Sequence, residues 1–203
     1  MTIIIKSEEE VAIMRESGLI NAEVRDVLYN AIEPGITGIE LDNIARKEIT
    51  ARGASATFPG YSPFNKPPYP GAICFSVNDE LVHGIPNDYS LKDGDIVNVD
   101  VTAYKNGWHG DTSRMFEIGK VPIKAKKLIE ATYESMMKGI QILKEGVQLG
   151  DIGSVIQKNV EADGFSVVQD FCGHGIGQSF HKEPNILHYG EKGTGKKIKA
   201  GMI

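Results

Sequence analysis

Hydrophobic residues recur at helical spacing in four segments of the chain. The first begins with a capping box, in which Ser7 is followed three residues later by Glu10, and its apolar positions continue to a Pro-Gly pair. A second capping box predicts a helix over 38–52. The same periodicity predicts two more helices, over roughly 123–144 and 149–162.

Runs rich in β-branched residues lie between and after these helices. They predict strands over 72–77 and 95–104, and a further strand leading into the stretch FCGHGIGQSFHKEPNILHY. Residues 58–71 contain five prolines, which predicts a surface loop. The dipeptide Asn106-Gly107 between two strand-like runs is the strongest short signal for a hairpin with a type I′ turn.

Two parts of the chain resemble each other. Residues 33–55 align with 144–166 at an offset of 111, and residues 91–96 align with 198–203 at an offset of 107. One interpretation is two related helix–sheet halves around a pseudo-twofold axis, with one site between them. The other is that any two capped amphipathic helices look alike. On the first interpretation the chain ends in mid-strand, and the counterpart of Asp100 would fall near position 207.

Composition narrows the class of protein. The 203 residues carry a net charge of −5, so there is no basic surface typical of nucleic-acid binding. The two cysteines, Cys74 and Cys172, are far apart and form no CxxC motif, which favours reduced thiols and a cytoplasmic location. The sequence has no recognisable signal peptide and no apolar run of about 20 residues, so we expect no membrane partner. We also expect no specific nucleic-acid partner and a monomer.

Two aspartates lie inside the predicted hairpin, although aspartate is depleted in strands. A two-residue loop at Asn106-Gly107 pairs Thr102 with Asp111 and places Asp100 diagonally from Asp111 on the same face, roughly 5–8 Å apart at Cβ. Like charges so close call for a cation, and carboxylates suit divalent metals. The alternative is an exposed edge hairpin with both acids in water, and a one-residue slip would place them on opposite faces.

The histidines add candidate ligands. His174 stands among three glycines, His181 follows seven residues later, and His83 lies in another glycine-flanked loop. A neutral imidazole from His174 would complement carboxylate ligands. We interpret His109 and His188 as ordinary polar residues, although His109 shares the face of the second acid.

Three motifs, HGIPN, VNVDVT with HGDTSRMF, and CGHGIGQSFHKEP, together resemble type I methionine aminopeptidase over nearly the whole chain. The resemblance implies an α+β pita-bread fold forming one catalytic-type domain over 1–203. It implies a two-metal site for Co, Mn, Fe or Zn, with ligands Asp100, Asp111 and His174. It implies that His83 and His181 act in catalysis and contact the substrate. The implied lining of the methionine pocket is Cys74, Phe180, Tyr61 and Tyr69.

The chain departs from this family in two places. The proline-rich loop at 62–68 looks longer than in compact members. The family also uses two glutamate ligands on later strands, which would lie past residue 203, so three of five ligands remain and the chain as given would hold one metal or none.

The function that the resemblance implies is removal of the initiator methionine from nascent polypeptides, with the ribosome as a further partner. One alternative is a catalytically dead pita-bread module that binds peptides or a partner protein. Another is a proline-directed peptidase of the same fold. Such peptidases usually carry a larger N-terminal domain, whereas the first helix here begins near residue 7.

Overall fold

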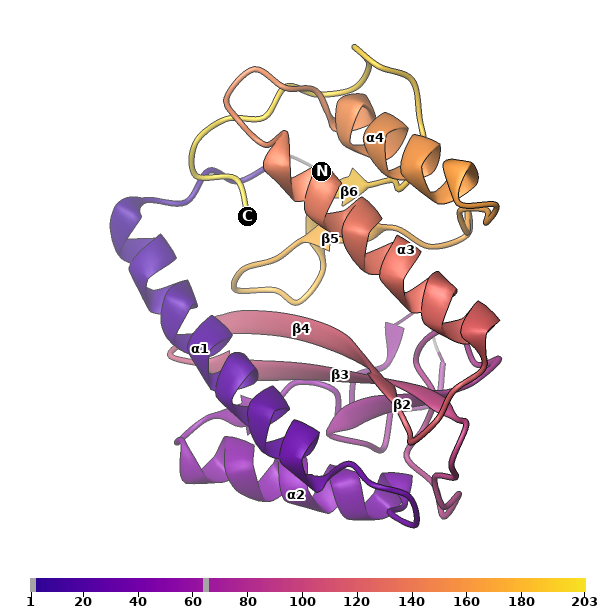
Figure 1. Cartoon of the computed structure of the whole chain (residues 1–203). Coiled ribbons are helices and arrows are strands. Elements are labelled where there is room, and N and C mark those ends of the chain that lie inside the picture. Colours follow the sequence, from indigo (N-terminus) through magenta and orange to yellow (C-terminus); the bar gives the residue numbers. More distant parts are fainter. Residues whose placement is uncertain (1–2, 64–65) are drawn as a thin grey trace. The chain divides into compact units, whose positions relative to one another are not determined.

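The computed structural model describes residues 3–63 and 66–203. The chain divides into two compact units, one formed by Ala12–Pro122 and the other by Met1–Val11 with Ile123–Ile203. Figure 1 shows the path of the chain, whose elements in order are α1 (Glu8–Ala31), α2 (Gly38–Ala51), β1 (Ser55–Ala56), β2 (Ile73–Val77), β3 (Ile96–Lys105), β4 (Trp108–Glu117), α3 (Ile123–Gln141), α4 (Leu149–Ala162), β5 (Gly173–Gly175) and β6 (Lys182–Ile186). The model mixes helices and antiparallel strands, as the predicted α+β class requires.

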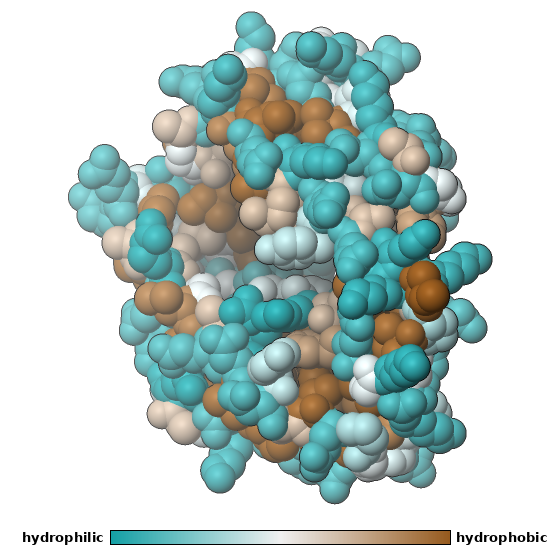
Figure 2. Space-filling model, in the orientation of Figure 1, coloured by the Kyte–Doolittle hydropathy of each residue, from teal (hydrophilic) through white to brown (hydrophobic). Residues whose placement is uncertain are grey.

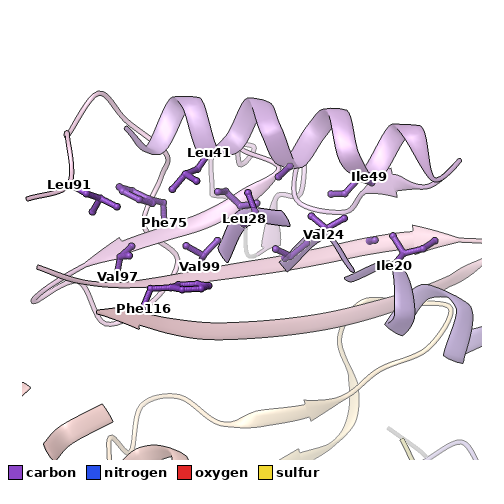
Figure 3. Packing of buried hydrophobic residues seen from close by; sticks show 14 of the residues in the cluster. Ile20, Val24, Leu28, Leu41, Ile49, Phe75, Leu91, Val97, Val99 and Phe116 are labelled. Atoms are coloured by element: carbon purple, nitrogen blue, oxygen red, sulfur yellow. The ribbon is translucent and has the colours of Figure 1, made fainter. Parts of the chain in front are cut away.

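The first unit is an antiparallel sheet with helices on one face. Strand β3 pairs with β4 on one side and with β2 and β1 on the other. Alternate residues of β3, from Val97 to Ala103, point into an apolar core that α1 and α2 cover (Figure 3). Leu28 of α1 and Leu41 of α2 are fully buried there, as is Phe75 of β2. The other face of the sheet carries Asp100 and Asp111, and we call it the polar face.

The predicted helices and strands of this unit are confirmed, with their ends shifted by one or a few residues. Both capping boxes are present: the Ser7 N–H donates to Glu10 Oε2 at 2.9 Å, and the Thr37 N–H donates to Glu40 Oε2 at 2.8 Å. The hairpin turn at Asn106-Gly107 has positive φ at both residues, 52° and 89°, as a type I′ turn requires.

The second unit packs α3 against α4 and adds the short pair β5–β6. Close approach of the helices is possible because Gly139 faces Ile156, whose side chain would lie 3.1 Å from an added Cβ. Helix α3 ends at Gln141, three residues earlier than predicted, because a turn closed by the Leu143 N–H and the Ile140 carbonyl follows it. On its exposed side this helix presents Met136 and other apolar side chains, and Figure 2 shows such residues interspersed with polar ones.

One strand prediction in this unit is wrong. Residues 165–172 form no strand, and only Gly173–Gly175 pair with β6. Within this short pair the register shifts between His174 and Gly175. The apolar residues of 165–168 lie in a loop, where Phe165 and Val167 are half-buried and Val168 is exposed.

The internal repeat reappears as the same local structure in each unit. In one, the Gly35 N–H donates to the Leu91 carbonyl at 2.7 Å; in the other, the Gly146 N–H donates to the Ile198 carbonyl at 3.0 Å. Both glycines have positive φ. The isolated strand bridges match as well, Thr37 with Ser90 and Gln148 with Lys197. The offsets of 111 and 107 thus join segments with equivalent hydrogen bonds, which chance resemblance between two helices would not produce.

Candidate functional site

The polar face brings the two acids together in the predicted register. Thr102 pairs with Asp111 and Asp100 pairs with Ser113, so the two carboxylates are diagonal neighbours on one face. The Thr102 hydroxyl donates to Asp111 Oδ1 at 2.7 Å and orients that carboxylate. On the other side of β3, Cys74 lies directly opposite Asp100.

The environment of Asp100 is unusual for a carboxylate. Its Oδ1 is enclosed and, among residues 3–63 and 66–203, has no hydrogen-bond partner. Burial raises the pKa of Asp100 far above its ordinary value, and the charge of Asp111 and a hydrogen bond with it raise the pKa further. The alternative of two acids standing in water is therefore wrong for Asp100. A cation beside the pair would neutralise it and occupy the orphaned oxygen, so these residues fit a metal ion.

Cys74 and Tyr69 lie beside the acids. Burial raises the pKa of the Cys74 thiol to about 12, with a further contribution from the charge of Asp100, so this thiol is protonated at neutral pH. The Tyr69 hydroxyl donates to the Gly84 carbonyl at 2.6 Å and is also 3.1 Å from the Ile73 carbonyl. Burial raises the pKa of Tyr69 as well, so it stays a donor.

The loop that carries Tyr61 and Tyr69 closes on itself. The Tyr69 N–H donates to the Tyr61 carbonyl at 2.9 Å, and the Gly60 N–H donates to the Tyr69 carbonyl at 2.9 Å. The two tyrosines are thus neighbours through their backbones. The predicted loop 62–68 lies between them, and its residues 64–65 fall outside the described part of the chain.

His83 follows β2 in a strained position. Its φ is 61°, a value that few residues other than glycine adopt. Burial lowers the pKa of His83, Lys66 lowers it further, and Asp111 opposes both. The imidazole is therefore neutral at pH 7 and is able to donate or accept a proton.

In the other unit, the rings of His174, Phe180 and His181 form one cluster. The centroids of His174 and His181 are 4.2 Å apart, and Phe180 meets the edge of His174 at 5.7 Å. His174 Nδ1 lies 2.9 Å from the Gly175 carbonyl, an acceptor, so in the neutral ring Nδ1 carries the proton and Nε2 holds the lone pair that binds metals. Gly175 itself is required, because a Cβ there would overlap the Glu183 carbonyl.

The predicted residues thus fall into two sets, one in each unit. Within residues 12–122, leaving aside 64–65, no three His, Cys, Asp or Glu side chains are grouped to hold a metal, so the acids there are a pair. The ring of His109 contacts that of Tyr104 in a tilted arrangement with a centroid distance of 4.7 Å, and burial lowers the pKa of His188. Neither observation gives these histidines a role at the acids.

Sequence reasoning missed one residue of the polar face. Thr57 continues the β1 pairing, since its N–H donates to the Thr102 carbonyl at 2.9 Å. Its Oγ1 is enclosed and has no partner within the described chain. The only signal was its place next to the proline-rich loop, which does not distinguish it from other loop threonines.

Comparison with known proteins connects the site to a family. The family model for metallopeptidase family M24 matches residues 12–203. A methionine aminopeptidase from Rickettsia prowazekii is 46% identical over 203 residues, which cover 100% of this chain and 76% of that protein. Methionine aminopeptidase 1 from Bacillus subtilis is 46% identical over 201 residues, covering 99% and 79%.

Solved structures agree. A crystal structure of methionine aminopeptidase from Rickettsia prowazekii matches with a TM-score of 0.92 at 45% identity, covering 99% of this chain and 79% of that one. A prolidase from Pyrococcus furiosus matches at 22% identity with a TM-score of 0.81, covering 98% and 55%, which shows the shared pita-bread fold alone. None of the helices in residues 3–63 and 66–203 is both long and apolar enough to span a membrane.

Proposed function

The chain belongs to metallopeptidase family M24, and we propose that it carries out the reaction of its methionine aminopeptidase relatives with Asp100, Asp111 and His174 as metal ligands. It is a metal-dependent hydrolase that removes the N-terminal methionine of proteins. We propose two divalent ions in a complete site. Carboxylate oxygens with one imidazole suit Mn, Fe, Co or Zn, and availability rather than geometry selects among these metals.

The observation that carries the ligand assignment is the enclosed Oδ1 of Asp100, which has no partner among residues 3–63 and 66–203 and lies beside the carboxylate of Asp111. Folding two acids into adjacent positions of a sheet is unfavourable unless a cation joins them. The hydrogen bond from Thr102 holds the Asp111 carboxylate in one orientation. For His174, support comes from the Gly175 carbonyl, which leaves Nε2 as the basic nitrogen.

The remaining residues act on the substrate in this proposal. Bound divalent ions supply Lewis-acid chemistry and lower the pKa of a water nucleophile. Neutral His83 accepts or donates a hydrogen bond at the scissile amide. His181 donates to the carbonyl oxygen, where negative charge develops during attack. Protonated Cys74, with Phe180, Tyr61 and Tyr69, forms an apolar, aromatic-edged surface for the methionine thioether.

The substrates are the N-termini of newly made proteins. We further propose that the protein meets them at the ribosome and works as a monomer. A free α-amine at the chain end distinguishes this exopeptidase reaction from internal cleavage.

The direct test is release of methionine from a Met-Ala-Ser peptide, measured during titration with Mn, Fe, Co or Zn. Asp111→Asn lowers turnover by at least about 100-fold at saturating metal, because several kcal/mol of transition-state stabilisation depend on the metal. The matched control is Asp26→Asn, since Asp26 is exposed and, among the described residues, its side chain pairs with Arg25 alone. Full turnover in Asp111→Asn would refute the ligand assignment, and peptide binding without release by the parent protein would favour the binding-module alternative.

A further inference from the structure

The segment 70–73 links the proline-rich loop to β2, and two proposed pocket residues flank it. Tyr69 precedes the segment and Cys74 follows it. Only the end of the segment, at Ile73, belongs to a strand. Something outside the sheet must therefore hold the rest of it in place.

Helix α2 supplies that hold through a buried carboxylate. Asp42 is only 7% exposed, and its Oδ1 accepts the N–H of Ala72 at 2.5 Å and that of Ile73 at 3.2 Å. Hydrogen bonds to an ionised acceptor are about twice as strong as those between neutral groups. One side chain on α2 therefore determines the position of two consecutive backbone N–H groups.

Arg46, one helical turn further on, completes the contact. Its Nε donates to Asp42 Oδ2 at 2.6 Å, and its Nη2 donates to the Pro70 carbonyl at 2.6 Å. The planar guanidinium makes both bonds at once, which a flexible ammonium group does not do in the same geometry. Asp42 and Arg46 together bind three of the four residues of the segment 70–73.

The segment has little freedom to shift without these bonds changing. A Cβ on Gly71 would lie 2.8 Å from Pro86 Cδ, so the backbone is packed closely there. At one end, the Tyr69 hydroxyl donates to the Gly84 carbonyl, next to His83. At the other, Cys74 pairs with Asp100. A displacement of the segment would therefore move the proposed pocket residues Tyr69 and Cys74, and Cys74 lies opposite Asp100.

We infer that Asp42 and Arg46 are positioning residues that set the fit of the methionine side chain by holding the segment 70–73. The inference rests on the proposed function of this site. Neither residue is a proposed ligand or pocket residue, and within the described chain their side-chain hydrogen bonds go to each other and to the segment 70–73. They act through Tyr69 and Cys74, so their loss changes substrate affinity and selectivity more than the chemical step.

The same helix contains a matched control. Arg52 pairs with Glu48 at the same i,i+4 spacing, at 2.7 Å, and also with Glu23 at 2.7 Å. In the described structure, none of Arg52, Glu48 and Glu23 forms a hydrogen bond with the segment 70–73. Arg52→Gln thus removes a helical ion pair of the same kind and leaves the segment alone.

The experiment compares Arg46→Gln, Arg46→Lys and Arg52→Gln in the full-length protein. Turnover of Met-Ala-Ser and norleucine-Ala-Ser peptides is measured at one saturating metal, together with Tm. We expect Arg46→Gln to raise KM for the methionine peptide about tenfold, because the loss of one charge-assisted hydrogen bond has about this effect. The kcat of the variant should stay within about twofold of that of the parent. Preference for methionine over norleucine falls in parallel. Arg46→Lys recovers part of the KM change, because an ammonium reaches one of the two acceptors.

A purely structural role predicts a different pattern. For the control, Arg52→Gln, we expect a lower Tm and an unchanged KM. The inference would be overturned if Arg52→Gln raised KM as much as Arg46→Gln does, or if Arg46→Gln changed Tm alone. Alkylation of Cys74 in the metal-free protein, with Cys172 as internal reference, gives a second readout. We expect faster labelling of Cys74 in Arg46→Gln, and an unchanged rate would also overturn the inference. Absence of methionine release by the parent would refute the proposed function, and Cys74 labelling would still decide whether the pair holds the segment.

Discussion

Replacement of Asp100 by asparagine should stabilise the metal-free protein while abolishing activity. In the absence of metal, the Asp100 carboxylate lies beside Asp111, and its Oδ1 is enclosed without a partner in the described part of the chain. Asparagine has nearly the same shape and no charge, and its amide is able to donate to Asp111. The substitution therefore removes an electrostatic cost from the folded state.

The size of this cost follows from the raised pKa. Because the folded-state pKa lies above the unfolded value, the folded protein binds more protons between the two values, and stability falls as pH rises through that window. For Asp100 the window runs from about 4 to about 8. Each pH unit corresponds to about 1.4 kcal/mol. Because Asp100 also interacts with a neighbouring carboxylate, only part of this range is expected as a gain, about 1–3 kcal/mol for Asp100→Asn at pH 7.

The assay is urea unfolding of the metal-free protein at several pH values, repeated with metal. The parent should lose stability between pH 4 and pH 8, whereas Asp100→Asn should lose less. Metal at about 100 times its Kd should add about 2.7 kcal/mol to the parent and nothing to the mutant. Destabilisation of the metal-free protein by Asp100→Asn, or an equal metal effect in both proteins, would refute the reasoning.

Two further substitutions test other parts of the site. Thr57→Val removes an enclosed hydroxyl that has no partner in the described structure, so it should leave Tm unchanged or raise it by a few degrees. A loss of about 1 kcal/mol in thermal unfolding would show that the hydroxyl is bonded. Gly175→Ala places a Cβ against the Glu183 carbonyl and should displace His174. Metal titration should then show at least about tenfold weaker binding. An unchanged metal affinity would contradict the role of this turn.

The hairpin illustrates what the sequence was able to predict. Asn106-Gly107 determines the turn type, the turn determines the register, and the register places Asp100 and Asp111 on one face. Each step depends on backbone geometry that neighbouring residues specify locally. The repeat was predictable for a similar reason, because glycines with positive φ and acidic caps recur at fixed offsets.

Other parts depend on contacts between residues distant in the chain and were missed. Asp42 binds N–H groups about 30 residues away, and nothing in an amphipathic helix pattern distinguishes that aspartate from a solvated one. The strand predicted before His174 failed because pairing needs a partner strand, which residues 165–172 lack within the described structure. Local patterns therefore predicted elements and turns, while the buried polar contacts appeared only with the fold.

Asp42 and Asp100, both in the first unit, show that the same residue type can serve different roles in one fold. Asp42 accepts two backbone N–H groups and a guanidinium, so its burial is compensated within the protein and it stabilises the fold. Asp100 has a backbone contact, but one of its oxygens is enclosed and has no partner among the described residues, and the charge of Asp111 acts against its ionisation. A fold that satisfies one buried carboxylate so fully is capable of satisfying the other. The carboxylate of Asp100 is not satisfied in this way, which argues that its missing partner is a bound cation. The protein gives up stability at Asp100 in order to bind that cation.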